Sequence, residues 1–283
     1  VVGGPNRPEL ASAVQDELEK LAQDNPKRLP VLPADLAIYR AITALTRGDQ
    51  VSLRAAIQRG AAHARELHHG ELLWHMERLR ALADVNSSAR AEGLAALRTL
   101  HGQATRESIL HTMPFVAFDR AVVFGEFAPG AAIDDDMLNA LAFDASEPPG
   151  IWSMKIRALS SAGLHDQART MLRAVVPADD LVKLPCDSQY LGTLGHLSRA
   201  ALALGATDYV RALYALLSRY PHHFTGHIAF LCEGSVPHLL GLLAQALSKH
   251  DAAREHLQRG LVMNEAAGFV ALAEETRTLL ASL

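Results

Sequence analysis

The feature that most constrains the fold is the helical spacing of apolar residues in the last fifth of the chain. Between Ser235 and Leu283, apolar or small residues recur three and four positions apart, with short polar breaks between the runs. This pattern predicts three helices, and the first two, joined at residues 248–251, form an antiparallel pair. Similar turns occur upstream, so this pair is the most readable copy of a repeated unit.

Composition favours the same fold class over the whole chain. Apolar residues make up 49% of the sequence, but much of that share is Ala and Leu, while aromatic residues contribute only 5%. Ala and Leu have the highest helix propensities, whereas sheets prefer β-branched and aromatic residues. No strand pattern persists anywhere. We therefore predict an all-α chain, a right-handed α-solenoid of antiparallel, tetratricopeptide-like helix pairs.

The predicted helices divide the chain into three parts. Residues 1–33 form an N-terminal helix and linker, residues 34–150 form degenerate helical repeats, and residues 151–283 form regular repeats that end in a capping helix. An irregular insertion is expected near 110–150, with Pro114 kinking or splitting a helix there and three acidic residues before a helix at 137–143. Other helices are predicted at 9–24, 34–45, 50–67, 71–83, 89–100, 151–162, 167–175, 188–204 and 209–219, and residues 227–232 could extend a helix.

Four turns share one layout, with an aspartate at the start of the second helix of each pair. A small residue or valine follows two positions later, which would let the two helices approach closely. An aspartate at the N-cap accepts hydrogen bonds from free backbone N–H groups, so we predict this role in all four turns. The four turns are centred on Asp49, Asp166, Asp208 and Asp251, and the last three of these are 42 and 43 residues apart.

The last pair carries a pattern of small and large residues at fixed places, namely Gly241, Ala253, Leu257 and Gly260. In this register the pair resembles a tetratricopeptide repeat. Residues 199–283 further resemble the C-terminal helical-repeat region of large bacterial regulators, found behind an ATPase module in transcriptional activators of the maltose-regulator type and in some adenylate cyclases. The stretches that carry this resemblance are ALALG at 201–205, the helix at 209–220, CEGSVPHLLGLLA at 232–244 and HDAAREHL at 250–257.

The resemblance implies a partner-binding or ligand-sensing part of a bacterial signalling or transcriptional regulator, in the cytoplasm. The chain lacks a GxxxxGK[ST] phosphate loop and a convincing helix-turn-helix segment, so neither nucleotide hydrolysis nor direct contact with nucleic acid is expected of it. Its first residue is Val1 and not methionine, and we expect it to be a piece of a larger protein. Partner identity and oligomeric state are left open.

Three arginines suggest where a ligand would bind. Arg40, Arg157 and Arg199 each stand nine residues before one of the turn aspartates, and Leu242 takes this place in the fourth unit. In a tetratricopeptide-like frame this position faces the concave groove. We hypothesise a groove that accepts an anion, from a carboxylate-rich peptide or a phosphorylated ligand. Three further residues complete the candidate set, Ser153, His238 and Gln245. The alternative is that the arginines simply lie on exposed faces of amphipathic helices.

Catalytic and metal sites are weaker candidates. The 14 histidines include two groups, but neither has the spacing of a zinc motif, and no cofactor or metal is expected. The groups are His63, His68, His69 and His75, and His222, His223 and His227. Ser235 lacks the GxSxG context and Cys186 has no placeable partner. We predict a binding module and not an enzyme, with two alternatives: a stand-alone peptide-binding adaptor, or an enzyme whose site joins His111, Asp119 and Arg120.

The remaining sequence features exclude several classes. The net charge of −4 argues against bulk attraction to nucleic acid or to an anionic membrane. No apolar run approaches the roughly 18 residues that span a bilayer. The two cysteines have no metal-type spacing and suggest no disulfide framework, so a reducing cytoplasm is the default.

Overall fold

The structure is a computed structural model that describes residues 5, 8–107, 109, 111–125, 133–142, 144, 146–227 and 232–283. These residues are all-helical, as predicted, and contain no β-strand, only an isolated bridge between Phe224 and Ser235. The helices of the first half are α1 (Pro8–Asp24), α2 (Leu32–Arg47), α3 (Gln50–Glu66), α4 (Gly70–Val85), α5 (Arg90–Glu107), α6 (Met113–Phe118), the π-helical η1 (Asp119–Phe124) and α8 (Asp135–Ala140). The second half contains α9 (Pro149–Ser161), α10 (His165–Val175), the 3₁₀ helix η2 (Ala178–Lys183), α11 (Tyr190–Leu204), α12 (Thr207–Leu217), α13 (Val236–Ala246), α14 (His250–Ala266) and α15 (Val270–Ser282). Some sequence predictions, for residues 127–132, 143 and 228–231, lie outside the described residues.

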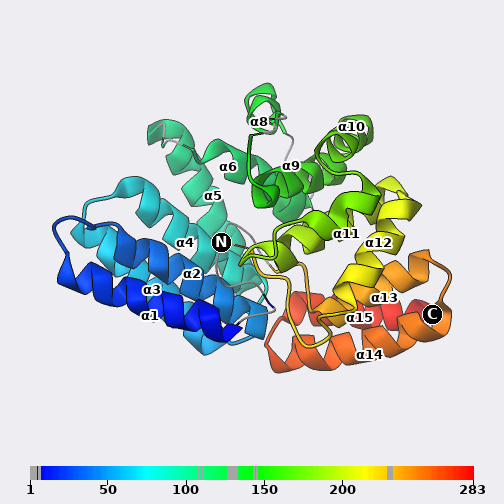
Figure 1. The fold of residues 1–283 in the computed structure, drawn as a ribbon. Helices are drawn as coiled ribbons and strands as arrows, with labels where there is room; N and C mark the ends of the chain where they lie inside the picture. The colour runs from blue at the N-terminus through cyan, green and yellow to red at the C-terminus, as the bar shows by residue number, and fades with distance from the viewer. Residues whose placement is uncertain are drawn as a thin grey trace.

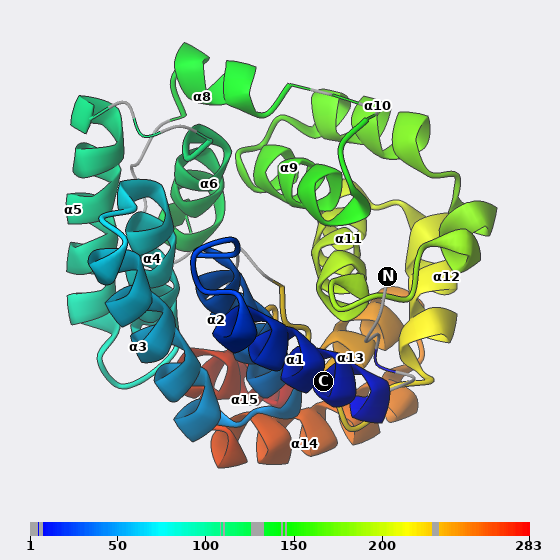
Figure 2. The ribbon, with the colours of Figure 1, turned by 60° about the vertical axis from the view of Figure 1, so that its left-hand side comes forward.

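Consecutive helices pack on one another along the chain (Figure 1), with contacts from α2 to α5 and from α9 to α15. The two ends of this series also meet, so the helices follow a closed circuit (Figure 2). Gly48, after α2, lies against Ala267, after α14, and Arg90 at the start of α5 pairs with Glu274 of α15 at 3.1 Å. Because the circuit is closed, residues from both halves of the sequence share an interior.

In the turns, the start of the next helix has a fixed spacing from a residue with positive φ and not from the aspartate. Among the described residues, eight helices begin two residues after a residue with positive φ, and these eight residues are Gly48, His68, His111, Gly163, Gly205, Gly234, Ser248 and Gly268. Asp49 directly follows such a residue and accepts a hydrogen bond from the Ser52 N–H at 3.0 Å, so its predicted N-cap role is confirmed. The other three aspartates stand three residues after the left-handed residue, inside the first turn.

The predicted N-cap role is therefore wrong for Asp166, Asp208 and Asp251, where Leu164, Ala206 and Lys249 hold the N-cap position. The left-handed residue decides where the next helix starts, because it reverses the chain after the preceding helix. The aspartates still complement the positive end of the helix from its first turn. Asp49 stands one residue after its positive-φ residue and the other three aspartates stand three residues after theirs, so aligning the four aspartates shifts the first unit by two positions. Accordingly Val51 is 81% exposed, whereas its supposed equivalents Ala168, Val210 and Ala253 are buried.

The middle of the chain is irregular, as predicted, for a reason that the structure makes clear. Pro114 lies in the first turn of α6, where its missing N–H costs nothing, and the helix simply begins there. The π-helical turn η1 continues α6 without a break. Asp134 caps α8 by accepting a hydrogen bond from the Met137 N–H at 2.9 Å, which confirms a capping role for the acidic residues.

Small residues let neighbouring helices approach closely. A Cβ on Gly241 would lie 2.4 Å from Cγ of Leu257, and one on Gly260 would lie 2.7 Å from the backbone N of His238. Gly93 of α5 likewise faces the α4 backbone. The largest core runs from Trp74 to Leu243 and so crosses the predicted boundary at residue 150. Within the residues described, no helix is both long and apolar enough to cross a membrane.

We predict that Gly93→Ala destabilises the protein by about 1–3 kcal/mol, because the new Cβ would lie 2.6 Å from the Ala81 carbonyl oxygen and from the Val85 nitrogen, which are backbone atoms that cannot move aside. Gly102→Ala on the same helix is the matched control. Its Cβ meets only the flexible end of Arg106, so the gain in helix propensity should stabilise the protein by about 0.5–1 kcal/mol. Urea unfolding measures both, and equal effects would contradict the close packing of α4 and α5.

Candidate binding site in the interior

The interior of the circuit is occupied by the chain itself. The connection from α12 to α13, which we call the central segment (residues 218–227 and 232–235), contacts helices from both ends of the sequence. The Phe224 N–H donates to the Thr46 carbonyl of α2 at 2.9 Å, and its ring packs edge-on against Phe269, with centroids 5.3 Å apart. The buried Cys232 joins the same core. An open concave groove is therefore absent at this place.

Two glycines make room for the central segment. A Cβ on Gly192 of α11 would lie 2.6 Å from the Gly226 carbonyl oxygen and 2.7 Å from Cβ of His227. A Cβ on Gly150, in the first turn of α9, would lie 2.4 Å from Nε2 of His227. The helices α9 and α11 thus approach this segment at positions that no other residue type fits.

Glu233 of the central segment is the hub of a buried charge network. Its Oε1 accepts a hydrogen bond from Nε of Arg157 on α9 at 3.0 Å and lies 3.1 Å from Nδ1 of His196 on α11. Its Oε2 lies 3.4 Å from Nε of Arg199, also on α11. One carboxylate therefore ties two helices to the segment between them.

Arg199 extends the network to the C-terminal helix. Its Nη1 and Nη2 donate to the two carboxylate oxygens of Glu275 on α15 at 2.6 and 2.8 Å, a bidentate pair. His238 of α13 lies between them, with its Nε2 at 3.0 Å from Arg199 Nη2 and its Nδ1 at 2.8 Å from the Thr276 hydroxyl. The network thus joins α9, α11, α13 and α15.

The protonation states follow from burial and from these partners. Burial alone would raise the pKa of Glu233, but Arg157, His196 and Arg199 outweigh it and lower the pKa to about 2. The pKa of Glu275 is lowered too, since Arg199 and His238 more than offset the effect of burial. Burial lowers the pKa of His238, so its ring is neutral at pH 7. The two positive charges of the arginines and the two negative charges of the glutamates in the network therefore sum to zero.

Three of the six candidate residues meet at the surface of this network. Arg157, Arg199 and Gln245 line a shallow hollow of about 430 Å³ over α9, α11 and α13, together with Leu202, Leu242 and Ala246. Arg157 donates through Nε to Glu233 and through Nη1 to Ser161, and its Nη2 has no partner among the described residues.

Two further candidates are buried beside the hollow and do not line it. His238 belongs to the charge network, and the Ser153 hydroxyl donates to the carbonyl of Gly150 at 2.9 Å. Both side chains support the helices that form the hollow, and a ligand would reach neither of them directly.

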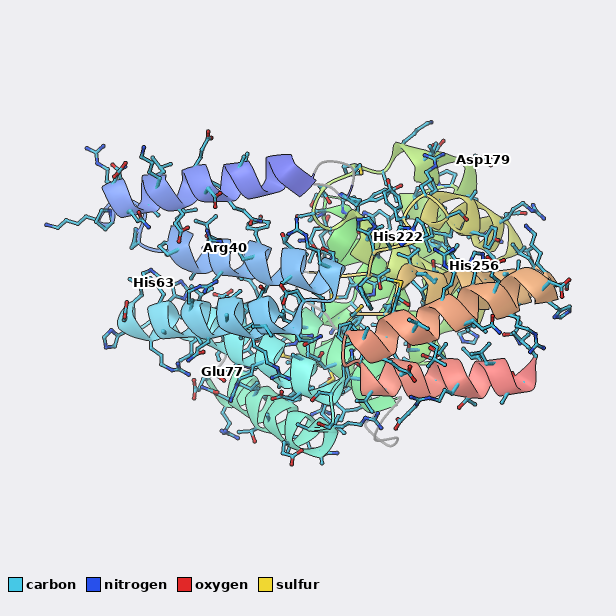
Figure 3. The ribbon with its side chains drawn as sticks, turned by 90° about the horizontal axis from the view of Figure 1, so that it is seen from below. Arg40, His63, Glu77, Asp179, His222 and His256 are labelled. Carbon is cyan, nitrogen blue, oxygen red and sulfur yellow. The ribbon has the colours of Figure 1, made fainter. Side chains whose placement is uncertain are left out.

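The placement of Arg40 beside the other two arginines is wrong. Arg157, Arg199 and Leu242 stand six residues before the left-handed residue of their turns, and six residues before Gly48 stands Ile42. Arg40 is therefore two positions away from the equivalent place. It pairs with Glu19 of α1 and lines a different recess, between α1, α2 and α3 (Figure 3).

A second buried cluster occupies the middle of the chain. Nε of Arg78 donates to Oδ2 of Asp119 at 2.7 Å, and Nε2 of His101 lies 2.9 Å from the same oxygen. Burial would raise the pKa of Asp119, but Arg78 and His101 lower it overall. His111 and Arg120 are not partners of this carboxylate, so the convergence that an enzyme site would need here is not found.

The histidines serve several structural roles. His69 caps α4, and His63 lies 2.7 Å from the Pro30 carbonyl oxygen. His75 packs edge-on against both Trp74 and Phe115, and burial lowers its pKa to about 4. In the second group, His222 is exposed while His227 is buried against His196. No group of three or more potential ligands that could hold a metal ion occurs in the described part of the chain.

Sequence reasoning missed the acidic half of the network. A signal for Glu233 was present, since it is the one Asp, Glu, Lys or Arg between Arg219 and Lys249. A lone charge in such an apolar stretch needs a buried partner. Nothing in the pattern around Glu275 distinguishes it from Glu274, because both lie on a regular helix and only packing decides which one faces inward.

Comparison with models of known protein families, with curated proteins and with solved structures finds no match to this chain. The resemblance to bacterial regulators stays a prediction.

We predict that Glu233→Gln destabilises the protein by about 3 kcal/mol, because it removes the charge that compensates two largely buried arginines. Glu265→Gln is the matched control, since Glu265 pairs with Arg277 at 2.6 Å where both side chains are about half exposed. That pair should be worth less than about 1 kcal/mol. Chemical denaturation compares the two variants, and a loss of similar size in both would show that Glu233 is not a hub.

Stability should fall in acid in a way that depends on Glu233. Its pKa is about 2 in the folded protein and near 4.5 when unperturbed, so its contribution is complete above pH 4.5 and is lost as the pH falls from 4.5 towards 2. The free energy of unfolding, measured at pH 5.5 and 4.0, should drop less in Glu233→Gln than in the parent. A parallel drop in both proteins would contradict the lowered pKa.

Proposed function

We propose that this chain is a non-catalytic helical-repeat module that binds a protein or peptide partner over the hollow of α9, α11 and α13. The observation that carries this proposal is the equivalence of the lining residues. Arg157, Arg199 and Leu242 occupy the same place in three successive units, and Gln245 lies one turn beyond Leu242. Repeat modules use such equivalent positions to build one extended surface.

The proposed fold is a right-handed α-solenoid of tetratricopeptide-like pairs. Its support is the packing of neighbouring units, in which α9 contacts α11 and α11 contacts α13. The close approach of Gly241 to Leu257 supports the same register within the last pair. In this arrangement α9, α11 and α13 are the first helices of their units and present one common face.

The chemistry of the hollow favours a single carboxylate over a highly charged ligand. Glu233 and Glu275 already compensate Arg157 and Arg199, so the hollow has little net positive charge. What it offers is the Nη2 of Arg157 and the amide of Gln245, which can donate hydrogen bonds to one carboxylate of a peptide. Binding should accordingly depend only weakly on salt.

The biological setting that we propose rests on the resemblance of residues 199–283 to the repeat region of bacterial regulators. The module would sense a partner or ligand in the cytoplasm for signal transduction or transcription regulation. A stand-alone adaptor would use the same hollow. An enzyme would need a different site, and the pairing of Asp119 with Arg78, deep in the core, does not favour one.

The experiment is a selection of random twelve-residue peptides on the whole chain, followed by affinity measurement with fluorescently labelled peptides. We expect the selected peptides to share an Asp, a Glu or a free C-terminal carboxylate. Gln245→Glu should weaken their binding at least about tenfold, because it replaces a donor by a like charge facing the carboxylate.

Gln258→Glu is the matched control, since Gln258 is exposed on α14, away from the hollow, and the substitution adds the same charge. The Gln258→Glu variant should bind the selected peptides with the same affinity as the parent protein. Selected peptides without any common acidic group, or equal weakening by both variants, would overturn the proposed site.

A further inference from the structure

Another recess lies beside α9 and α11, where four stretches of the chain meet. Its walls come from α2, from the start of α9, from the stretch before and at the start of α11, and from the central segment. We call it the Tyr190 pocket, and its volume is about 230 Å³. The lining residues are Tyr39, Pro148, Pro149, Gly150, Ile151, Leu184, Pro185, Asp187, Gln189, Tyr190, Thr193 and His227.

Two hydroxyls that line this pocket lack partners among the described residues. Tyr190 and Thr193 lie one turn apart on α11 and are only 5% and 2% exposed. Neither hydroxyl makes a hydrogen bond to any residue that the structure describes, although the Tyr190 ring packs edge-on against Tyr220. Other buried threonines are satisfied, as Thr276 is by the Leu272 carbonyl. Neither oxygen is among the fully buried polar atoms that lack a partner, so both hydroxyls open onto the pocket and can form hydrogen bonds to a ligand there.

The charges around the pocket exclude an anion as the preferred ligand. No lysine or arginine lines it, and its one carboxylate is Asp187. His227 is neutral, because burial, together with His196 and Arg78, holds its pKa well below the usual range. Burial, Tyr220 and Cys186 raise the pKa of Tyr190 to about 12, so its hydroxyl keeps its proton and can donate.

The remaining walls suit a flat apolar group. Tyr39 of α2 lines the pocket and is 42% exposed. Apolar side chains line the rest of the pocket, among them Pro148, Pro149 and Pro185. The volume is below the range of about 300–1,000 Å³ that drug-sized ligands occupy, so one ring system is the appropriate size.

We propose that the Tyr190 pocket binds a small uncharged ring compound that carries a hydrogen-bonding group. The ring lies between Tyr39 and the prolines, and its polar group bonds to the hydroxyls of Tyr190 and Thr193. This site is separate from the hollow over α9, α11 and α13, and its existence does not depend on the function proposed for that hollow.

The test titrates the whole chain with phenol, indole and benzamide, and with benzoate as the charged isostere of benzamide, followed by NMR. We expect at least one neutral compound to bind at millimolar concentration or below, with shifts confined to the pocket. Benzoate should bind at least about tenfold more weakly than benzamide, since the pocket offers no cation.

Two variants give a signature that a purely structural role would not. Tyr190→Phe and Thr193→Val should each weaken binding about tenfold, and each should leave Tm nearly unchanged, because the lost hydroxyl opens onto the pocket and bonds to no described residue. Tyr209→Phe is the control: its hydroxyl donates to the Val176 carbonyl at 2.9 Å, so the variant should lower Tm and leave binding unchanged.

Failure of all three neutral compounds to bind would overturn the proposal. A fall of Tm in Tyr190→Phe and Thr193→Val would overturn it as well, since it would show that these hydroxyls have structural partners. Gln245→Glu should leave binding of the ring compounds unchanged, since Gln245 lines the other site. A negative result for the Tyr190 pocket is therefore distinguishable from a negative result for peptide binding at the hollow.

Discussion

The buried carboxylate of Glu233 is the constraint on which the interior of this protein depends. Two arginines and a histidine from α9 and α11 contact it, and Arg199 passes the connection on to Glu275 of α15. Charges in such a place are tolerated only when they are paired and hydrogen-bonded. The pairing in turn fixes the central segment between the helices, so electrostatic compensation and packing of the segment support each other.

This arrangement changes what the helical array can bind. A curved array of helix pairs would ordinarily present an open concave surface, but here Phe224 and His227 of the central segment occupy that space, and the Phe224 N–H donates to the Thr46 carbonyl of α2. Arg157 and Arg199, which suggested an anion-binding groove, are therefore already paired with carboxylates of their own chain. The shallow hollow and the Tyr190 pocket are both open recesses, and both are lined by residues of α11.

The two sites differ in how far the sequence could predict them. Arg157, Arg199 and Gln245 follow from the repeat, because helices of equal length joined by equal turns place equivalent residues together. Arg40 was misplaced because an aspartate was used to align the turns, while the left-handed Gly48 sets the register. The Tyr190 pocket had no sequence signal, since its walls come from four separate stretches and its unpaired hydroxyls are recognisable only when their surroundings are known.

The sequence by itself determined the helices, most of their ends and the close packing at Gly241, because helix periodicity and small residues at contact positions act locally. Tertiary structure decided the rest. The closure of the circuit, the burial of Glu233 and the choice of Glu275 over Glu274 depend on contacts between residues tens of positions apart. A local pattern carries no information about such partners, because side chains of the same type on one helix differ only in what lies opposite them.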